Sequence, residues 1–271
     1  MVPVTPFDGV GIWVLGTRWG GTAISSSQAA DYAAEGVSWA AVKVSDGTVG
    51  GGQAVIQDMQ ACMAGGLRVI PWCFIEPTAG PTGPQMTACF QASGSGQTAA
   101  CADVEAQPQD IAQLVDQFGG PGTAVVTWGN PLPTHPGQPS IGQLADIGVG
   151  AILPMAYSGA WGITPQAAIA AMRQSYLECG LGSRMPPLLP VHDSGAMLEF
   201  AQAAQAAGYL GVSGYRHGAN GISPASFAGI AQVFPKGQSG PRPTQPTPAA
   251  PVQLRSGVAY LTPKGDLLTL D

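Results

Sequence analysis

The sequence predicts an α/β protein built on a (β/α)8 barrel, or TIM barrel, for three reasons. Short apolar runs alternate with segments of helical character eight times between residues 1 and 234. The runs are apolar almost throughout, as expected of parallel strands that are covered on both faces. Several helical segments also start with capping residues, such as Ser25, Thr164-Pro165 and Ser223-Pro224.

The predicted elements follow in order along the chain. The strands are expected at 11–15, 39–44, 68–75, 99–105, 123–128, 150–157, 187–192 and 209–214. The helices that follow them are expected at 27–36, 53–64, 85–92, 108–118, 141–146, 165–179, 196–207 and 224–233. Eight such units are the number that closes a barrel of this class.

A doubly wound open sheet is the alternative to the barrel. It would place a phosphate-binding GxGxxG turn after the first strand and an acidic residue at the end of the second. Residues 16–21 are rich in glycine but do not fit that spacing, and the second strand lacks the acidic end. The barrel is therefore the better prediction.

The chain changes character after residue 234. Residues 235–251 are rich in proline, which predicts an extended linker between a barrel at 1–234 and a C-terminal segment at 252–271. In that segment, apolar residues 258–262 and 267–270 flank a turn and predict a β-hairpin. Because a lone hairpin is marginally stable in water, it is expected either to dock on another chain or to be a disordered tail.

Composition excludes some partners and locations. A net charge of −6 with only ten Lys and Arg argues against nucleic acid and anionic lipid as partners. No run approaches the roughly 18 apolar residues of a membrane span. The N-terminus lacks signal-peptide features, so synthesis in the cytoplasm without a signal peptide is expected. Charged residues make up 10%, which indicates either a surface covered by other subunits or a biased composition.

Cysteine and histidine give no sign of a metal or cofactor. The cysteines are odd in number and lack paired metal spacing, which favours buried free thiols over disulfides: Cys62, Cys73, Cys89, Cys101 and Cys179. The three histidines are scattered, so no metal site is expected. No cofactor is expected either.

The strand ends carry the candidate chemistry. Asp103 and Glu105 lie two positions apart at the end of the fourth predicted strand, so they project from the same face. Paired carboxylates of this kind serve glycosidic-bond hydrolysis as general acid and as nucleophile, base or electrostatic partner. Other polar and aromatic residues at strand ends are predicted to bind a saccharide, although aromatic residues could also simply close the barrel: Trp13, Lys43, Asp46, Trp72, Glu76, Trp128, Asn130, Tyr157, Asp193 and Tyr215.

Part of the chain resembles a known family. Residues 43–48 read Lys-x-Ser-Asp-Gly-Thr after an apolar strand, residues 61–71 run from Ala-Gly-Gly-Leu into the next strand, and 103–105 read Asp-x-Glu. This pattern resembles the glycoside hydrolase family 25 lysozymes over about residues 10–160. The resemblance implies Glu105 as general acid and Asp103 as its neighbouring carboxylate.

The chain also departs from that family. The first strand ends without the family's aspartate, and Ser158 follows Tyr157 where another acidic residue is expected. Residues 154–157, Pro-Met-Ala-Tyr, also resemble family 18 chitinases. Of the chitinase motif DxxDxDxE only Asp103 and Glu105 are present, and Cys101 replaces the preceding aspartate.

Two functions follow from these observations. The first is a virion-associated structural or carbohydrate- or receptor-binding module, as in a phage particle, tethered to other subunits through residues 252–271. Its location would be the virion, or outside the cell after assembly. The alternative is an active peptidoglycan or polysaccharide glycoside hydrolase, lysozyme-like, that uses Glu105 and Asp103. The sequence leaves open whether the chain is an enzyme.

Overall fold

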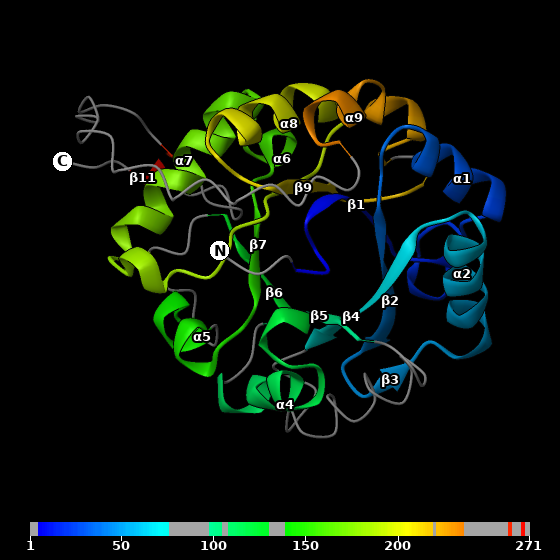
Figure 1. Cartoon of the computed structure of the whole chain (residues 1–271), viewed down its shortest axis with the longest axis horizontal. Helices are drawn as coiled ribbons and strands as arrows, with labels where there is room; N and C mark the ends of the chain where they lie inside the picture. The colour runs from blue at the N-terminus through cyan, green and yellow to red at the C-terminus, as the bar shows by residue number, and fades with distance from the viewer. Residues whose placement is uncertain are drawn as a thin grey trace.

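Eight parallel strands close into a barrel. A computed structural model describes residues 5–75, 98–104, 108–129, 139–218, 221–235, 260–261 and 267–268. The first strand, β1 (Gly9–Val14), pairs in parallel with both β2 (Trp39–Asp46) and β9 (Gly211–Gly214), so the sheet has no open parallel edge (Figure 1). This closure confirms the (β/α)8 prediction over the doubly wound sheet.

The remaining barrel strands follow in chain order. They are β4 (Arg68–Ile75), β5 (Ala100–Val104), β6 (Thr123–Trp128), β7 (Ala151–Met155) and β8 (Val191–His192), each paired in parallel with its neighbours. A short strand that was not predicted, β3 (Val49–Gly50), turns back antiparallel to the end of β2. The predicted strand 187–192 is too long, because β8 covers only its last two residues. Prolines at 187 and 190 have no N–H for the sheet, and they explain this shortening.

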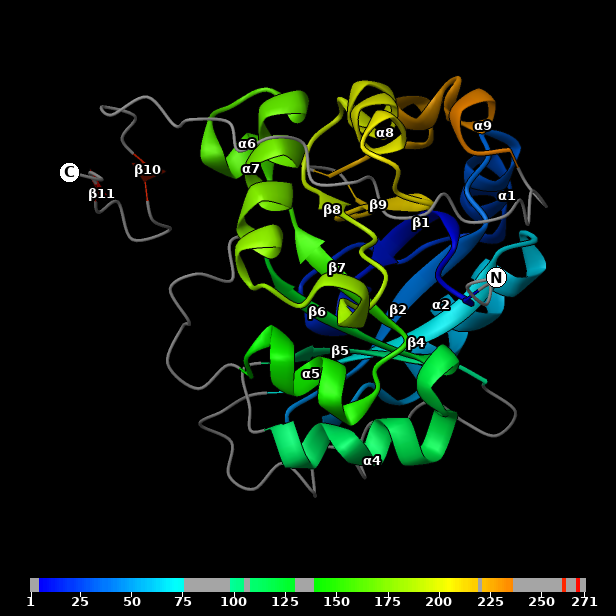
Figure 2. The same cartoon turned by 60° about the vertical axis from the view of Figure 1, so that its left-hand side comes forward.

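Helices cover the outside of the barrel (Figure 2). The predicted helices are confirmed, to within one or two residues, as α1 (Ser26–Ala34), α2 (Gly52–Ala64), α4 (Pro108–Phe118), α5 (Ile141–Ile147), α7 (Pro165–Glu178) and α8 (Met197–Ala206). The serine before α1, Ser25, accepts from the N–H of Gln28 in a capping box, and Ser140 does the same before α5. The predicted helix 85–92 lies outside the described residues.

The predicted helix 224–233 is wrong as a single element. It is a 3-10 turn, η4 (Pro224–Phe227), followed by the short helix α9 (Ile230–Val233). Gly229 separates them with φ of 81°, a left-handed conformation that ends one turn and cannot continue a helix. Four further short turns were not predicted: η1 (Thr17–Trp19), η2 (Gly120–Gly122), α6 (Ser158–Trp161) and η3 (Gly182–Arg184).

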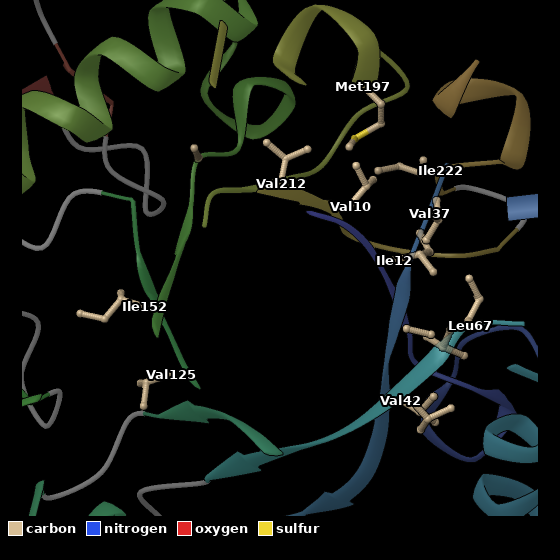
Figure 3. Close-up of a cluster of buried hydrophobic side chains, with 14 of the residues drawn as sticks. Val10, Ile12, Val37, Val42, Leu67, Val125, Ile152, Met197, Val212 and Ile222 are labelled. Carbon is tan, nitrogen blue, oxygen red and sulfur yellow. The ribbon is translucent and has the colours of Figure 1, made fainter. Parts of the chain in front are cut away.

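The apolar residues form two layers. Alternate residues of each strand point outward and pack against the helices, among them Val10, Ile12, Val42, Val125 and Ile152 (Figure 3). The other residues of each strand fill the barrel interior. Because both faces of the sheet are buried, the strands need apolar residues at nearly every position, which is the pattern on which the prediction depended.

The interior is filled asymmetrically. Three tryptophan rings enter from neighbouring strands: Trp13 from β1, Trp39 from β2 and Trp72 from β4. The Trp13 ring lies edge-on to both others, with centroids 6.5 Å from Trp39 and 5.3 Å from Trp72. Strands β5, β6 and β7 contribute the small side chains Cys101, Ala124 and Ala151 to the same cluster. The tryptophan rings therefore occupy the interior at β1, β2 and β4, where the facing strands contribute smaller side chains.

The described residues of the C-terminal segment form two antiparallel pairs, and the described cysteines are free thiols. Tyr260 pairs with Leu268 and Leu261 with Leu267, antiparallel, as in the predicted hairpin. Residues 236–251 of the predicted linker lie outside the described residues. Four cysteines are free, of which Cys62, Cys73 and Cys101 are buried and Cys179 is half-buried, whereas Cys89 is not described. Among the described helices, none has the length and hydropathy to cross a membrane.

Candidate functional site at the carboxyl ends of the strands

A β-bulge brings two predicted site residues together. Lys43 and Asp46 are three positions apart on β2, and in a regular strand an odd separation puts side chains on opposite faces. The register of β2 against β4 shifts between Lys43 and Ser45, so that Lys43 lies opposite Trp72 and Asp46 opposite Phe74. Since Trp72 and Phe74 both belong to the interior cluster, the shift turns Lys43 and Asp46 to the same inner face.

Lys43 is enclosed by aromatic rings and paired with a carboxylate. Its Nζ lies 2.8 Å from Asp46 Oδ2 and between 5.1 and 5.3 Å from the ring centroids of Trp19, Trp72 and Phe74. The Trp19 indole N–H also donates to the backbone carbonyl of Lys43, at 3.1 Å. The Lys43 side chain is 9% exposed and that of Asp46 39% exposed. The rings therefore enclose the ammonium, whereas solvent reaches the carboxylate.

Asp103 lies on the same level of the barrel as Asp46. In the parallel registers, Phe74 is opposite Asp46 on one side and opposite Asp103 on the other. Two carboxylates thus flank one half-buried aromatic ring on three consecutive strands, β2, β4 and β5. The Asp103 side chain is half-buried, and it faces the barrel interior because it lies two positions from buried Cys101 of the interior cluster.

Two tyrosines add aromatic rings to this end of the barrel. Tyr157, after β7, and Tyr215, after β9, stack with ring centroids 6.0 Å apart and an interplanar angle of 20°. Burial raises the pKa of Tyr157 well above its usual value, and the nearby Tyr215 phenol and the Asp103 and Asp193 carboxylates raise it further. The Tyr157 phenol therefore keeps its proton at neutral pH.

Asp193 is occupied by the backbone. Its two carboxylate oxygens accept from the N–H groups of Gly159 and Ala160, at 2.9 and 2.7 Å. These N–H groups belong to the first turn of the short α6, and a carboxylate there satisfies donors that have no partner within the helix. A Cβ at Gly159 would lie 3.0 Å from Asp193 Oδ2, so the close approach favours glycine. Asp193 thereby fixes the segment that follows Tyr157.

Several predicted tryptophans lie deeper than the strand ends. Trp13 is 2% exposed and Trp72 3% exposed, so their visible role is to fill the barrel. The Trp13 indole N–H donates to Ser213 Oγ at 2.9 Å, whereas Trp72 Nε1 is buried without a partner in the described part of the chain. Trp128, at the end of β6, is half-buried, and its carbonyl accepts from the Tyr176 hydroxyl at 2.9 Å.

Three predicted site residues, Glu76, Glu105 and Asn130, lie outside the described residues. The roles of all the predicted residues remain predictions. The structure brings Lys43, Asp46, Asp103, Tyr157 and Tyr215 to the carboxyl ends of the strands. In the described ranges, no group of three His, Cys, Asp or Glu side chains could hold a metal ion.

Trp19, Phe74 and Ser213 were not among the predicted site residues. Phe74 lies two positions after Trp72 in a predicted strand, so the period of two could have placed it on the inner face. Trp19 follows β1 in a short turn, and no local pattern indicates that it reaches Lys43 on the next strand. Ser213 is a buried polar residue in an apolar strand, and its partner Trp13 is 200 positions away.

His192, the last residue of β8, lies on the outer side of the barrel. His192 is fully buried, and its ring stacks on Phe200 of α8 at 4.1 Å. Its Nε2 lies 2.8 Å from Ser194 Oγ, and its Nδ1 lies 3.5 Å from the carbonyl oxygen of Ala156. Burial lowers the pKa of His192, so the neutral ring donates from Nδ1 and accepts at Nε2.

Comparison with known proteins supports the fold class. No family model and no curated protein sequence matches this chain. Among solved structures, an active-site mutant of Rhizomucor miehei β-1,3-glucanosyltransferase in complex with laminaritriose is similar with a TM-score of 0.50 and 12% identity, over 76% of this chain and 85% of that chain. The glycoside hydrolase family 17 β-1,3-glucanosyltransferase from the same organism matches over the same shares, with a TM-score of 0.50 and 10% identity.

A third structure, the endo-β-1,4-mannanase from Thermotoga petrophila, has a TM-score of 0.49 and 10% identity over 79% of this chain and 68% of that chain. At such low identity the two β-1,3-glucanosyltransferase structures show the shared barrel and no more. The resemblance to family 25 and the phage origin are not shown and remain predictions. The chain has the closed eight-stranded parallel barrel, with surrounding helices, that is also the fold of glycosidases.

Proposed function

We propose that this chain binds a polysaccharide at the carboxyl ends of its barrel strands and cleaves or transfers a glycosidic bond there. The observation that carries the proposal is Asp103, an inward-facing carboxylate at the carboxyl end of β5, paired in register with Phe74 of β4. In barrels of this class the active site lies at this end. A carboxylate among aromatic rings suits a sugar, because rings stack on pyranose faces and carboxylates bind hydroxyls or exchange protons.

Several half-buried rings at this end can contact a ligand. Trp19, Phe74, Tyr157 and Tyr215 are all half-buried. These rings lie at the ends of four strands, so together they can contact more than one sugar unit. This arrangement favours an oligosaccharide over a monosaccharide as the ligand. Glu105, the general acid that the family 25 resemblance implies, stays a prediction within this proposal.

A substrate panel tests the activity. The names of the similar structures suggest β-1,3-glucan and β-1,4-mannan, and the family 25 resemblance suggests peptidoglycan. We expect the release of new reducing ends from at least one of these polymers. Asp103→Asn should abolish it, whereas Asp31→Asn, at an exposed position on α1, should leave it unchanged. Glu105→Gln tests separately the general acid that the family 25 resemblance implies. A wild-type chain that neither binds nor cleaves any of the three would overturn the proposal.

The composition favours a second candidate, a binding module within a virion. Charged residues make up only 10% of the chain, which is consistent with a surface covered by other subunits, and the proline-rich residues 235–251 suit a tether. In this case residues 252–271 would dock on another subunit, and the barrel would bind a saccharide without cleaving it. Deleting residues 252–271 should prevent incorporation into the assembly and leave the barrel folded. Unchanged incorporation would remove the docking hypothesis.

A further inference from the structure

We propose that Asp46 is the second catalytic carboxylate of this site, acting as the base across Phe74 from Asp103. The proposal rests on the proposed glycosidase activity and assigns the reaction a stereochemical course. It replaces the simple binding role that the sequence suggests for Asp46. It also supplies a carboxylate from β2 in a chain whose first strand ends without one.

The separation of the two carboxylates supports a base that acts through water. Asp46 and Asp103 lie on the same level with one strand between them. Because neighbouring strands are about 4.8 Å apart, their Cα atoms are separated by roughly 9.5 Å. The two side chains reach inward and so approach each other more closely than that. Inverting glycosidases place their carboxyl groups about 6.5–9.5 Å apart to admit a water, whereas retaining enzymes need about 5–5.5 Å.

The surroundings of Asp46 leave it free to act. Oδ2 is bound by the Lys43 ammonium at 2.8 Å, whereas Oδ1 accepts no hydrogen bond from the described residues. The side chain is 39% exposed, so water reaches it. By contrast, both oxygens of Asp193 are occupied by backbone N–H groups. Of these two carboxylates, only Asp46 has an oxygen open to a reacting water.

The ring between the two carboxylates gives the sugar a place to lie. Phe74 is half-buried, and its ring centroid lies 5.3 Å from the Lys43 Nζ. A pyranose stacked on this ring would have Asp46 toward one edge and Asp103 toward the other. Lys43 is then a positioning residue, because it fixes the Asp46 carboxylate through the ion pair and does not touch the sugar.

The reaction step balances with these groups alone. Asp46 takes a proton from a water, the water oxygen bonds to the anomeric carbon, and the glycosidic C–O bond breaks. The leaving oxygen takes a proton from the Asp103 carboxyl group, which this step requires in its acid form. Asp46 ends protonated and Asp103 ionised, and exchange with solvent restores both. The anomeric configuration is inverted.

The test uses the full chain and a polymer that the wild type cleaves. We expect Asp46→Asn to lower kcat by about 100-fold or more, the usual contribution of a general base, with KM within a few-fold. Asp31→Asn serves as the matched control, and thermal unfolding shows whether each variant is folded. Lys43→Met, which keeps Asp46 but loses its anchor, should lower kcat by a smaller factor.

Two further readouts separate a base from a structural residue. In Asp46→Ala, azide should restore turnover and give a glycosyl azide of inverted configuration, because azide attacks without a base. Proton NMR of the first wild-type product should show the inverted anomer. Three results would each overturn the assignment of Asp46. They are a kcat of Asp46→Asn within threefold of the control, a product with retained anomeric configuration, and loss of activity in Glu105→Gln but in no other carboxylate variant. A wild-type chain inactive on every polymer would instead overturn the proposed function as well.

Discussion

Removing either partner of the Lys43–Asp46 ion pair should change the free energy of unfolding by different amounts. Asp46→Asn leaves the ammonium, 9% exposed, without an anion, whereas Lys43→Met leaves a carboxylate that is 39% exposed and can be hydrated. Loss of one partner from a buried pair costs about 3–5 kcal/mol, and exposed pairs contribute about 0–1 kcal/mol. Asp46→Asn should therefore fall between these two costs, and Lys43→Met should fall near the cost of an exposed pair.

The rings around Lys43 determine how much unfolding free energy each variant is expected to lose. In Asp46→Asn the ammonium keeps its three rings, and the new amide oxygen can still accept one hydrogen bond, so we expect a loss of about 2 kcal/mol. In Lys43→Met the thioether packs against the same rings, so we expect a loss of about 0.5–1 kcal/mol. The double variant has no unpaired charge and should lose less than the sum of the two single variants.

Urea unfolding at pH 7 measures these losses, with Asp31→Asn as the control for a carboxylate without an ion pair. The order of stability should be wild type, then Lys43→Met, then Asp46→Asn. If Lys43→Met loses as much free energy as Asp46→Asn, the buried ammonium is not the costly partner and the reasoning fails. A loss of about 2 kcal/mol also leaves an ordinary domain folded, so that kcat of Asp46→Asn can be measured.

Three further predictions concern the barrel and its loops. Ser213→Ala leaves the Trp13 indole N–H buried without a partner, and thermal unfolding should show a loss of about 1–3 kcal/mol; a neutral result would mean that water replaces the serine. Gly16→Ala should cost at least about 1 kcal/mol in the same assay, because φ is 71° and the new Cβ would lie 2.4 Å from Asp58 Oδ2; equal stability would show that the loop rearranges freely. Burial lowers the pKa of His192 in the folded chain. The stability that the neutral His192 contributes is therefore present above the unfolded pKa near 6.5 and is lost as the pH falls below that value. The loss is at most about 1.4 kcal/mol per pH unit. His192→Gln should flatten the dependence of unfolding free energy on pH between 7 and 5, and an unchanged slope would assign it to other groups.

The fold was predictable because it depends on local patterns. Strands buried on both faces must be apolar at nearly every position, and these runs could be counted directly. The errors arose where backbone chemistry overrides that pattern. Prolines at 187 and 190 shorten β8, and Gly229 divides the last predicted helix.

The site was predictable only in part. The carboxyl ends of the strands can be located from the strand ranges, which placed Asp103 and Tyr157 correctly at that end of the barrel. The bulge after Lys43 depends on how β2 pairs with β4, so the sequence of β2 alone puts Lys43 and Asp46 on opposite faces. Trp19 reaches Lys43 through a turn that no periodic pattern describes.

A crystal structure of the chain with a bound oligosaccharide tests the central claim most directly. The oligosaccharide should come from the polymer that gives new reducing ends, or from the one that binds most tightly. The proposed function and the assignment of Asp46 together predict a pyranose stacked on Phe74, with Asp46 and Asp103 on either side of one glycosidic bond. A saccharide bound only at the opposite end of the barrel, or on its outer helices, would contradict the proposal.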